Sequence, residues 1–597
     1  FAGREAGSYR NRSSSAGRPH RTARGSERQP MKFLNGEISN VHSAAFLLGA
    51  AGLLSRLLGI LRDRMLAANF GAGRELDVYF AAFQIPDLVS VVFLLGAGSA
   101  AILPIFQEYL ARDKERARIL ISQLFFLFIL GSVLLMLMAL FLAPYFMRLV
   151  TPGFSAPDRD LTVVLTRIML LSPILLGLSS IFSAVVQSFQ RFLAYALAPV
   201  LYNLGIIAGV FFFVPIWGLP GLAIGVVLGA FLHFALQAMA AGKLGFLPRL
   251  LSLRSLLSPG ALRVMRLAFP RVLSVSVTRL TVLVLVAIGS ALAAGSIAVW
   301  QLAQNLFFVP VGIFGVSYAI VLFPKLSRSY INRDAQAFFQ ELYLGLRTIL
   351  FWIMPTAVIF IVLRAHIVRV ALGAGAFSWE DTRLSAAVLA ALTVAMLAEG
   401  VAALLIKAYY ALENTWWPLA INIGASLISI ALAFVFSRML ATASPTRDLI
   451  TRIFRISDLP NPEVLGLALG FSLGLILNIL FLYFALRRLA ERTFKVCEHY
   501  PMVTLGKIVL AALTAGAAAY AVRVSFSETL PLITFVRVLA QGVIAGAVGF
   551  GAYFGILVLL RAEEMNWLMS ALRKRLMKPK ILPEHWDGEG IHPSQTP

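Results

Sequence analysis

The first long apolar segment of the chain contains charged side chains that could bind an anion inside a membrane. Arg56 and Asp63 fall on one face of a helix together with Gly52 and Gly59, because these positions are spaced by four, three and four residues. Arg62 lies roughly 120° around the same helix. An ionisable side chain in a bilayer is costly and usually faces a cavity or a partner. The pattern favours a polar cavity wall, while an Arg56–Asp63 ion pair and snorkelling of Arg62 to the interface stay open.

Further charged positions lie inside other apolar segments. Asp77 opens the second segment, where an acid can also serve only to stabilise the helix N-terminus. Arg279 lies inside the seventh segment, and Glu399 and Lys407 lie eight residues apart on a similar face of the tenth. We take Asp77 and Arg279 as candidates for the binding site, and Glu399 with Lys407 as a candidate gate or ion pair. Each of them could instead belong to a structural ion pair between helices.

This set of residues fits an anionic substrate better than a cationic one. A guanidinium presents a planar fork of donors that matches phosphate oxygens, and it stays charged when desolvated. Acids within the apolar segments are few, whereas a cation exporter would need them. No HExxH, Walker A or CxxC motif is present, and Cys497 is the single cysteine. A GxSxG string at Gly470–Gly474 lies inside an apolar segment, not at the strand-to-helix turn that a nucleophile elbow requires. The sequence therefore predicts a transporter rather than an enzyme, without metal or cofactor, driven by membrane potential or an ion gradient.

The elements that must position these residues are membrane-spanning helices. The chain of 597 residues is 59% hydrophobic and 14% charged, and its mean hydropathy is +0.82. Apolar blocks of roughly 20 or more residues match the thickness of a bilayer core. Such long continuous blocks must be helical, so we expect an all-α polytopic protein with about fourteen spans. The expected spans are 42–68, 78–105, 118–150, 160–188, 194–215, 219–240, 262–292, 296–324, 340–370, 384–411, 416–440, 463–487, 504–524 and 532–560.

The charge distribution predicts the orientation of these spans. The formal net charge of +23 would suit a nucleic-acid binder, but Lys and Arg gather in alternate loops, as the positive-inside rule expects. The opposite connections 214–220 and 293–295 carry no charge. Both termini are therefore predicted to be cytoplasmic. One outer stretch, after the eleventh span, runs against this rule and carries Arg438, Arg447, Arg452 and Arg455.

The spans suggest two groups of six followed by a pair, as in transporters built from repeated halves. The Arg-rich and Ser-rich start of the chain, before Met31, reads as a disordered tail or as translated upstream sequence. The expected organisation is a basic N-terminal tail at 1–41, a first lobe at 42–240, a basic cytoplasmic loop at 241–261, a second lobe at 262–487, two further spans at 488–560 and a cytoplasmic tail at 561–597.

The order and spacing of several motifs resemble one known family, that of the MurJ (MviN) lipid II flippases. These are bacterial proteins of the multidrug/oligosaccharidyl-lipid/polysaccharide exporter superfamily. The resemblance covers roughly residues 42–560. It rests on Ser55-Arg56-Leu57-Leu58-Gly59, Arg62-Asp63, Phe70-Gly71-Ala72-Gly73, Asp77, Ile85-Pro86-Asp87-Leu88, Gly96-Ala97, Glu108-Tyr109, Thr151-Pro152-Gly153-Phe154, Ala198-Pro199-Val200, Phe323-Pro324-Lys325, Gly375-Ala376-Phe377 and Lys407-Ala408-Tyr409-Tyr410.

The resemblance implies a flippase in the bacterial cytoplasmic membrane that moves lipid II, a peptidoglycan precursor, by alternating access. It implies two six-helix lobes in a V, a cationic cavity for the pyrophosphate of the undecaprenyl-linked sugar-peptide, and a groove at the last two spans for its lipid tail. Cell-wall synthesis proteins are possible partners. By position, Arg56, Arg62, Asp63 and Asp77 match charged residues that are important in the family.

The sequence departs from the family pattern at several positions. Ser90 and Val91 stand where arginines are frequent, Leu95 where an acid is frequent, and Asn305 where an arginine is expected. Arg279 is a candidate replacement for the lost charge. These departures keep two other functions open. One is export of another lipid-linked glycan or a small molecule within the same superfamily, and the other is a non-transporting scaffold in cell-wall synthesis.

Overall fold

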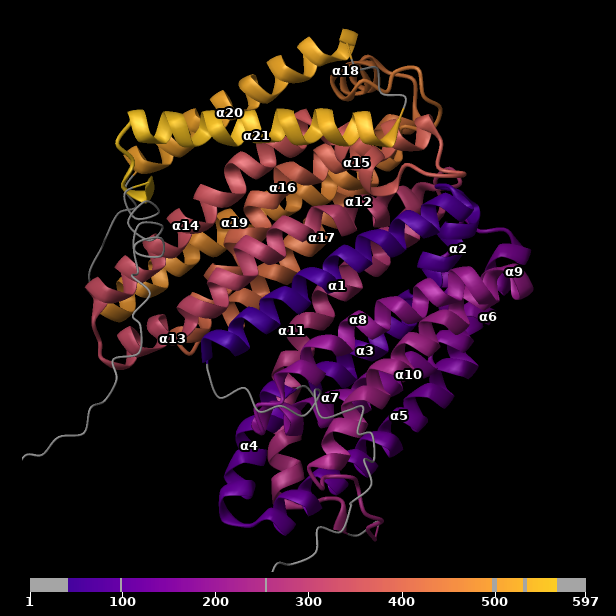
Figure 1. The fold of residues 1–597 in the computed structure, drawn as a ribbon, viewed down its shortest axis with the longest axis vertical. Helices are drawn as coiled ribbons and strands as arrows, with labels where there is room; N and C mark the ends of the chain where they lie inside the picture. Colours follow the sequence, from indigo (N-terminus) through magenta and orange to yellow (C-terminus); the bar gives the residue numbers. More distant parts are fainter. Residues whose placement is uncertain (1–40, 97–98, 253–254, 496–501, 530–533, 566–597) are drawn as a thin grey trace, which may run out of the picture.

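The structure is a computed structural model that describes residues 41–96, 99–252, 255–495, 502–529 and 534–565 (Figure 1). All regular elements in these ranges are helices. The first half contains α1 (Val41–Phe70), α2 (Arg74–Ala82), α3 (Gln84–Gly96), α4 (Ser99–Arg112), α5 (Lys114–Val150), α6 (Ala156–Met169), α7 (Leu171–Ser188), α8 (Phe192–Ala208), the π-helix η2 (Gly209–Phe213), α9 (Val214–Trp217) and α10 (Leu219–Lys243).

The second half continues in the same way. It contains α11 (Pro259–Ser290), α12 (Ser296–Pro310), the π-helix η4 (Val311–Val316), α13 (Ser317–Ile331), α14 (Ala335–Val362), α15 (Arg364–Leu372), α16 (Trp379–Ala411), α17 (Trp416–Ala441), α18 (Pro445–Phe454), α19 (Val464–Phe494), α20 (Met502–Thr529) and α21 (Phe535–Leu559). The predicted tails 1–41 and 561–597 lie almost entirely outside the described residues.

Within the described ranges, 11 helical segments are long and apolar enough to cross a membrane. Three further segments are less apolar or are broken. The first is α1, which carries the charged face around Arg56 and Asp63. The second is the run α2–α4, and the third is α11, whose apolar part is Ser276–Ser290. Counted with the eleven, these three agree with the fourteen spans expected from the sequence.

The second predicted span, 78–105, is not one continuous helix, so that expectation was wrong. It is interrupted at Phe83, between α2 and α3. Pro86 lies in the first turn of α3, where the missing amide hydrogen costs no helical hydrogen bond. A helix can therefore begin there more easily than it can continue through. The break lets α2 turn its polar first turn toward the other half of the molecule.

The outer stretch after the eleventh span also contains a helix that the sequence analysis treated as a loop. This helix is α18. Pro445 occupies its first turn, and the Ser444 hydroxyl accepts a hydrogen bond from the Arg447 amide at 3.2 Å. The helix ends at Arg455, which adopts a left-handed conformation with φ of 60°. The end of α18 is thereby turned back toward α15 and α16.

Small residues set the close packing inside each lobe. A Cβ atom on Gly205 of α8 would lie 2.2 Å from the Cα atom of Gly229 on α10. In the second lobe, a Cβ on Gly470 of α19 would lie 2.1 Å from the backbone nitrogen of Ala433 on α17. Helices in a bilayer associate through such close contacts because the apolar surroundings give little hydrophobic drive. The two terminal helices, α20 and α21, pack outside α14, where the Tyr553 hydroxyl donates to the Phe351 carbonyl at 2.7 Å.

The two lobes meet at one end and diverge from it (Figure 1). At the meeting end, the Ala376 amide donates to the Ala68 carbonyl at 2.8 Å, and the Arg64 guanidinium donates to the Val370 carbonyl at 2.6 Å. Gly295 has a φ of +89°, and a Cβ atom there would lie 1.9 Å from the Ala72 carbonyl oxygen. This end carries the connections that the sequence analysis placed outside the cell.

Candidate functional site

A small polar cavity lies between the two lobes, and we call it the central pocket. It has a volume of about 170 Å³. Its walls come from α1, α2 and α3 of the first lobe and from α11 and α12 of the second. It brings together two of the predicted site residues, Arg62 and Arg279. The other lining residues are Leu66, Tyr79, Phe80, Phe83, Gln84, Asp87, Val282, Gln301, Gln304 and Asn305.

Arg62 is held firmly within this site by its neighbour on α1. Its Nε and Nη2 atoms donate to Asp63 Oδ1 at 2.9 and 2.7 Å, and its Nη1 atom donates to Asn203 Oδ1 at 3.2 Å. The side chain of Asp63 is 6% exposed. Its second oxygen, Oδ2, accepts from the Asn305 amide of α12 at 2.8 Å. Asp63 therefore joins the first lobe to the second while it neutralises Arg62.

Arg279 and Asp87 form the second charged pair of the central pocket. Arg279 Nη1 lies 3.5 Å from Asp87 Oδ2, and the two side chains are 47% and 44% exposed. At this distance and exposure the pair is looser than Arg62–Asp63. Arg279 thus contributes a cation to the same cavity in which Asn305 stands at the position of an expected arginine. Ser90 and Val91 do not line this pocket.

Arg56 crosses from α1 to the other lobe farther along the same helix. Its Nη1 atom donates to the Val309 carbonyl at 3.5 Å, and its Nη2 atom would lie 2.7 Å from a Cβ atom on Gly312. The glycine of η4 leaves room for the guanidinium. Among the residues that the structure describes, no carboxylate forms an ion pair with Arg56. The Arg56–Asp63 pair that the sequence left open is not formed.

Asp77 lies outside the central pocket, at the end where the lobes meet. It is fully buried. Its Oδ2 atom accepts from the Gly295 amide at 2.6 Å, and its Oδ1 atom accepts from the Ala298 amide at 2.8 Å. These amides belong to the N-terminus of α12, where a carboxylate interacts favourably with the helix dipole. The acid therefore caps a helix of the opposite lobe, and we call this contact the Asp77 latch.

Glu399 and Lys407 both lie on α16, about 12 Å apart along its axis. That spacing does not place their side chains in direct contact. Lys407 Nζ lies 5.3 Å from the ring centre of Phe323 and 5.8 Å from that of Tyr410. Neither residue lines the central pocket. Their role as a gate stays a prediction.

Three polar residues of this region were not singled out from the sequence for the roles they have here. Asn203 orients Arg62, Asn305 binds Asp63, and Gln301 donates to Asn305 Oδ1 at 3.1 Å. A signal was available in the sequence, because amides within apolar segments are uncommon and need partners. Their spacing gives no indication of which partner each one finds. In the part of the chain that the structure describes, no group of three metal-ligating side chains is found.

Comparison with known proteins places this geometry in one family. The family model described as lipid II flippase MurJ matches residues 66–541. The lipid II flippase MurJ of Burkholderia cenocepacia is 26% identical over 75% of this chain and 84% of its own length. The probable lipid II flippase MurJ of Rhizobium tropici is 30% identical over 66% of this chain and 75% of its own length.

Solved structures agree on the fold. A structure described as lipid II flippase MurJ in its inward closed conformation has a TM-score of 0.67 and 24% identity. It covers 86% of this chain and all of its own. An inward-facing MATE transporter of the MOP superfamily has a TM-score of 0.59 and 16% identity, and covers 76% of this chain. The match along residues 66–541 spans most of the chain, so the protein belongs to the lipid II flippase MurJ family.

Proposed function

We propose that this protein moves lipid II across the bacterial cytoplasmic membrane by alternating access. The observation that carries the proposal is the polar central pocket, in which charged side chains of both lobes meet within an otherwise apolar bundle. Buried charges between repeated halves are typical of a transport pathway. The curated relatives are named for lipid II, and its pyrophosphate is an anion of the kind that guanidinium groups bind.

The arginines would divide the work of binding. Arg56 has no acidic partner among the described residues, and Arg279 is held only loosely by Asp87, so both are available to the pyrophosphate. Arg62 is already neutralised by Asp63 and would join only when that pair opens. A phosphate that enters between the lobes would thus compete with Asp63 and Asp87 for the same guanidinium groups.

The size of the central pocket implies motion. Its volume of about 170 Å³ lies below the 300–1,000 Å³ of sites that hold small ligands. A sugar-peptide headgroup enters only if the lobes separate. Separation must break the Asp77 latch on the outer side and the contact between Asp63 and Asn305 in the middle. These two contacts are therefore among those that form and break as access alternates.

Orientation and energy source complete the proposal. Both termini are cytoplasmic, as the distribution of Lys and Arg indicates. The sequence contains no nucleotide-binding motif, so the cycle is driven by membrane potential or an ion gradient without a cofactor. Each elementary charge moved across the field gains about 2.3 kcal/mol per 100 mV.

The test is complementation of a bacterium depleted of its own lipid II flippase. The full chain should restore growth, and Arg56→Ala should reduce rescue at least about tenfold at equal membrane expression, since hydrogen bonds to charged groups contribute about 1.5–3 kcal/mol. Arg328→Ala is the matched control, because Arg328 is exposed on α13 and does not line the central pocket. Full rescue by Arg56→Ala would contradict the role given to this residue.

A second candidate is transport of another lipid-linked glycan. It is favoured by Asn305, which offers a neutral amide where the family pattern has an arginine. Under this alternative the well-expressed chain does not replace the lipid II flippase, but vesicles that contain it move a different polyprenyl-linked sugar. If no polyprenyl-linked sugar moves, the scaffold function remains.

A further inference from the structure

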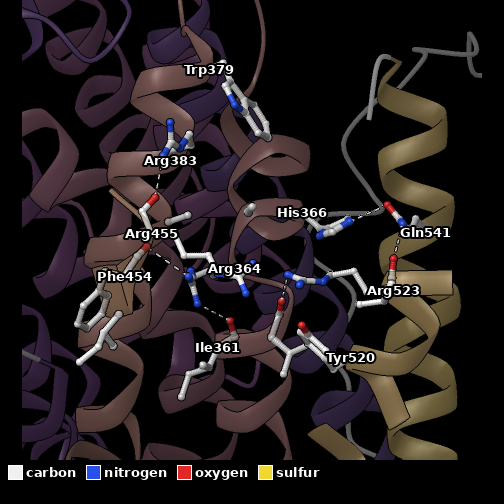
Figure 2. A pocket seen from close by; sticks show the side chains of 15 residues that line it. Ile361, Arg364, His366, Trp379, Arg383, Phe454, Arg455, Tyr520, Arg523 and Gln541 are labelled. Atoms are coloured by element: carbon white, nitrogen blue, oxygen red, sulfur yellow. Dashed lines mark hydrogen bonds between the residues drawn. The ribbon is translucent and has the colours of Figure 1, made fainter. Parts of the chain in front are cut away.

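A larger cavity lies at the outer end of the second lobe, away from the central pocket. Its volume is about 740 Å³, and six elements form its walls: α14, α15, α16, α18, α20 and α21. Four arginines line it, and we call it the arginine pocket. They are Arg364, Arg383, Arg455 and Arg523. In Figure 2, the Arg364 guanidinium points to the Phe454 and Ile361 carbonyls, whereas Arg523 reaches into the cavity from α20.

The positive charge of this pocket is only partly balanced. Arg383 forms a two-pronged ion pair with Asp458, with N–O distances of 2.5 and 2.6 Å. Glu380 is the other acid close to Arg383. Among the residues that the structure describes, no ion pair involves any of the other three arginines.

Two of the remaining arginines, Arg364 and Arg523, are held in place by neutral groups. Arg364 donates to the Ile361 and Phe454 carbonyls at 3.4 and 3.3 Å, and Arg523 donates to the Val362 carbonyl at 3.4 Å. A carbonyl orients a guanidinium without cancelling its charge, and each guanidinium has five N–H donors. Donors are therefore left over on groups that already point into the cavity.

The neighbours of Arg364 show how close the cations lie. Burial lowers the pKa of Arg364 below its ordinary value, and the positive charges of Arg455 and Arg523 lower it further. Burial likewise lowers the pKa of His366, the Gln541 hydrogen bond opposes this shift, and Arg523 adds to it. His366 Nε2 lies 2.8 Å from Gln541 Oε1, while its buried Nδ1 atom has no hydrogen-bond partner among the residues that the structure describes. A bound anion would relieve all of these repulsions.

Apolar side chains also line the cavity, which limits the kind of anion. Ile361, Ile453 and Val524 lie among the arginines. All six walls lie near helix ends, where a membrane helix meets the lipid headgroups. Arg455 comes from the one outer stretch that departs from the positive-inside rule. The exception therefore coincides with a cavity that combines cationic and apolar side chains.

We propose that the arginine pocket binds the phosphate group of a membrane lipid. The chains of this lipid lie along the apolar side chains between α14 and α20, beside Ile361 and Val524. Basic pockets between membrane helices bind lipid headgroups by this chemistry, since guanidinium forks match phosphate oxygens. The lipid belongs to the outer leaflet if the orientation proposed above holds, but the site itself does not depend on transport. The site would give the second lobe a lipid contact close to α15, the helix whose Val370 carbonyl accepts from Arg64 of α1.

The test is native mass spectrometry of the full chain in detergent with three probes. Dioctanoyl phosphatidic acid carries both phosphate and chains, dioctanoylglycerol carries chains alone, and inorganic phosphate carries the anion alone. We expect retention of phosphatidic acid only. The Arg455→Gln/Arg523→Gln variant should lose at least about tenfold in affinity for it. Arg452→Gln is the matched control, because Arg452 is exposed on α18, three residues before Arg455, and does not line the pocket.

Each outcome bears on the proposal. Unchanged binding of phosphatidic acid by the double variant would overturn the site. Equal retention of dioctanoylglycerol would overturn it too, because binding would then depend on the chains and not on the phosphate. If inorganic phosphate displaces phosphatidic acid at an equal concentration, the ligand of the site is free phosphate and the lipid proposal is wrong. Should the double variant not fold, Arg455→Gln alone applies, with an expected loss of about threefold. Binding without transport would refute the proposed function and leave this site standing.

Discussion

The central pocket and the arginine pocket both contain arginines, but the charges are arranged in opposite ways. In the central pocket, Arg62 and Arg279 each face an acid, at 2.7 and 3.5 Å. In the arginine pocket, one of four arginines forms an ion pair with an acid of the described chain, namely Arg383 with Asp458. The central pocket joins two lobes, whereas the arginine pocket lies within one lobe and its two terminal helices.

The difference teaches how charge pairing relates to function in a membrane. A paired arginine can exchange its acid for a substrate phosphate and back, so each pair can serve as a switch between two states. An unpaired cluster has no internal anion to return to, and it suits continuous occupancy by an external one. Pairing in the first site therefore favours turnover, and the lack of pairing in the second favours retention.

The largest expected effect comes from breaking the tight pair of the central pocket. Asp63→Ala leaves Arg62 without its counter-charge and removes the bond to Asn305. Removing one partner of a buried pair costs about 3–5 kcal/mol. We expect a lower unfolding temperature in detergent and loss of complementation. Asp160→Ala, on the exposed surface of α6, should change neither. A variant that unfolds at the wild-type temperature would show that the pair contributes little.

The second effect concerns the Asp77 latch, at the end where the lobes meet, which the proposed orientation places on the outer side. Asp77→Asn removes the charge at the N-terminus of α12, and bonds to a charged group contribute about 1.5–3 kcal/mol. The outward-open population should rise about tenfold or more. Spin labels at Asp160 and Asp448, on the outer ends of the two lobes, should report longer distances in a Cys497→Ser background.

The matched control for this measurement is Glu75→Gln. Glu75 lies in the same first turn of α2 but is exposed, so its charge does not reach α12. Identical distance distributions for Asp77→Asn and the wild type would mean that the latch does not hold the lobes together.

The smallest effect is a pH dependence at the rim of the arginine pocket. The hydrogen bond from Arg383 lowers the pKa of Asp458 below its ordinary value. A lowered folded-state pKa gives stability that is present above the ordinary value near 4 and is lost as the pH falls through the lowered one. The unfolding temperatures of wild type and Asp458→Asn should therefore differ slightly at pH 7 and converge as the pH falls below the lowered pKa of Asp458. If the difference between the two unfolding temperatures grows as the pH falls, the predicted direction is wrong.

The fold was largely predictable because its main determinant is local. Blocks of apolar residues long enough to cross a bilayer must be helical wherever they occur. The predicted span 416–440 coincides with α17, and the predicted span 42–68 with α1. The prediction failed where local breaks change the path, as at Pro86 in α3 and at the helix α18. Such breaks depend on which residues the new helix ends contact in the folded protein, and the hydropathy of the sequence contains no information about those contacts.

The residues of the site were predictable by type but not by partner. An arginine within an apolar block indicates a cavity or an ion pair, so Arg56, Arg62 and Arg279 were candidates from the sequence. Arg62 and Arg279 line the central pocket, and Arg56 does not. That Arg62 pairs with its neighbour Asp63, and Arg279 with Asp87, follows from how α1, α3 and α11 pack. The sequence signalled the arginine pocket only through Arg455, which lies in the outer stretch that departs from the positive-inside rule.

The sequence by itself determined the helical membrane architecture and the family, since each depends on composition or on short motifs. The tertiary structure decided which charges meet. Asp77 caps α12 although 218 positions separate it from Gly295. Arg364, Arg455 and Arg523 share a cavity although three separate helices or helix ends supply them. The physical reason is that the energy of a charge in a membrane depends on its neighbours in space, and those neighbours are set by packing.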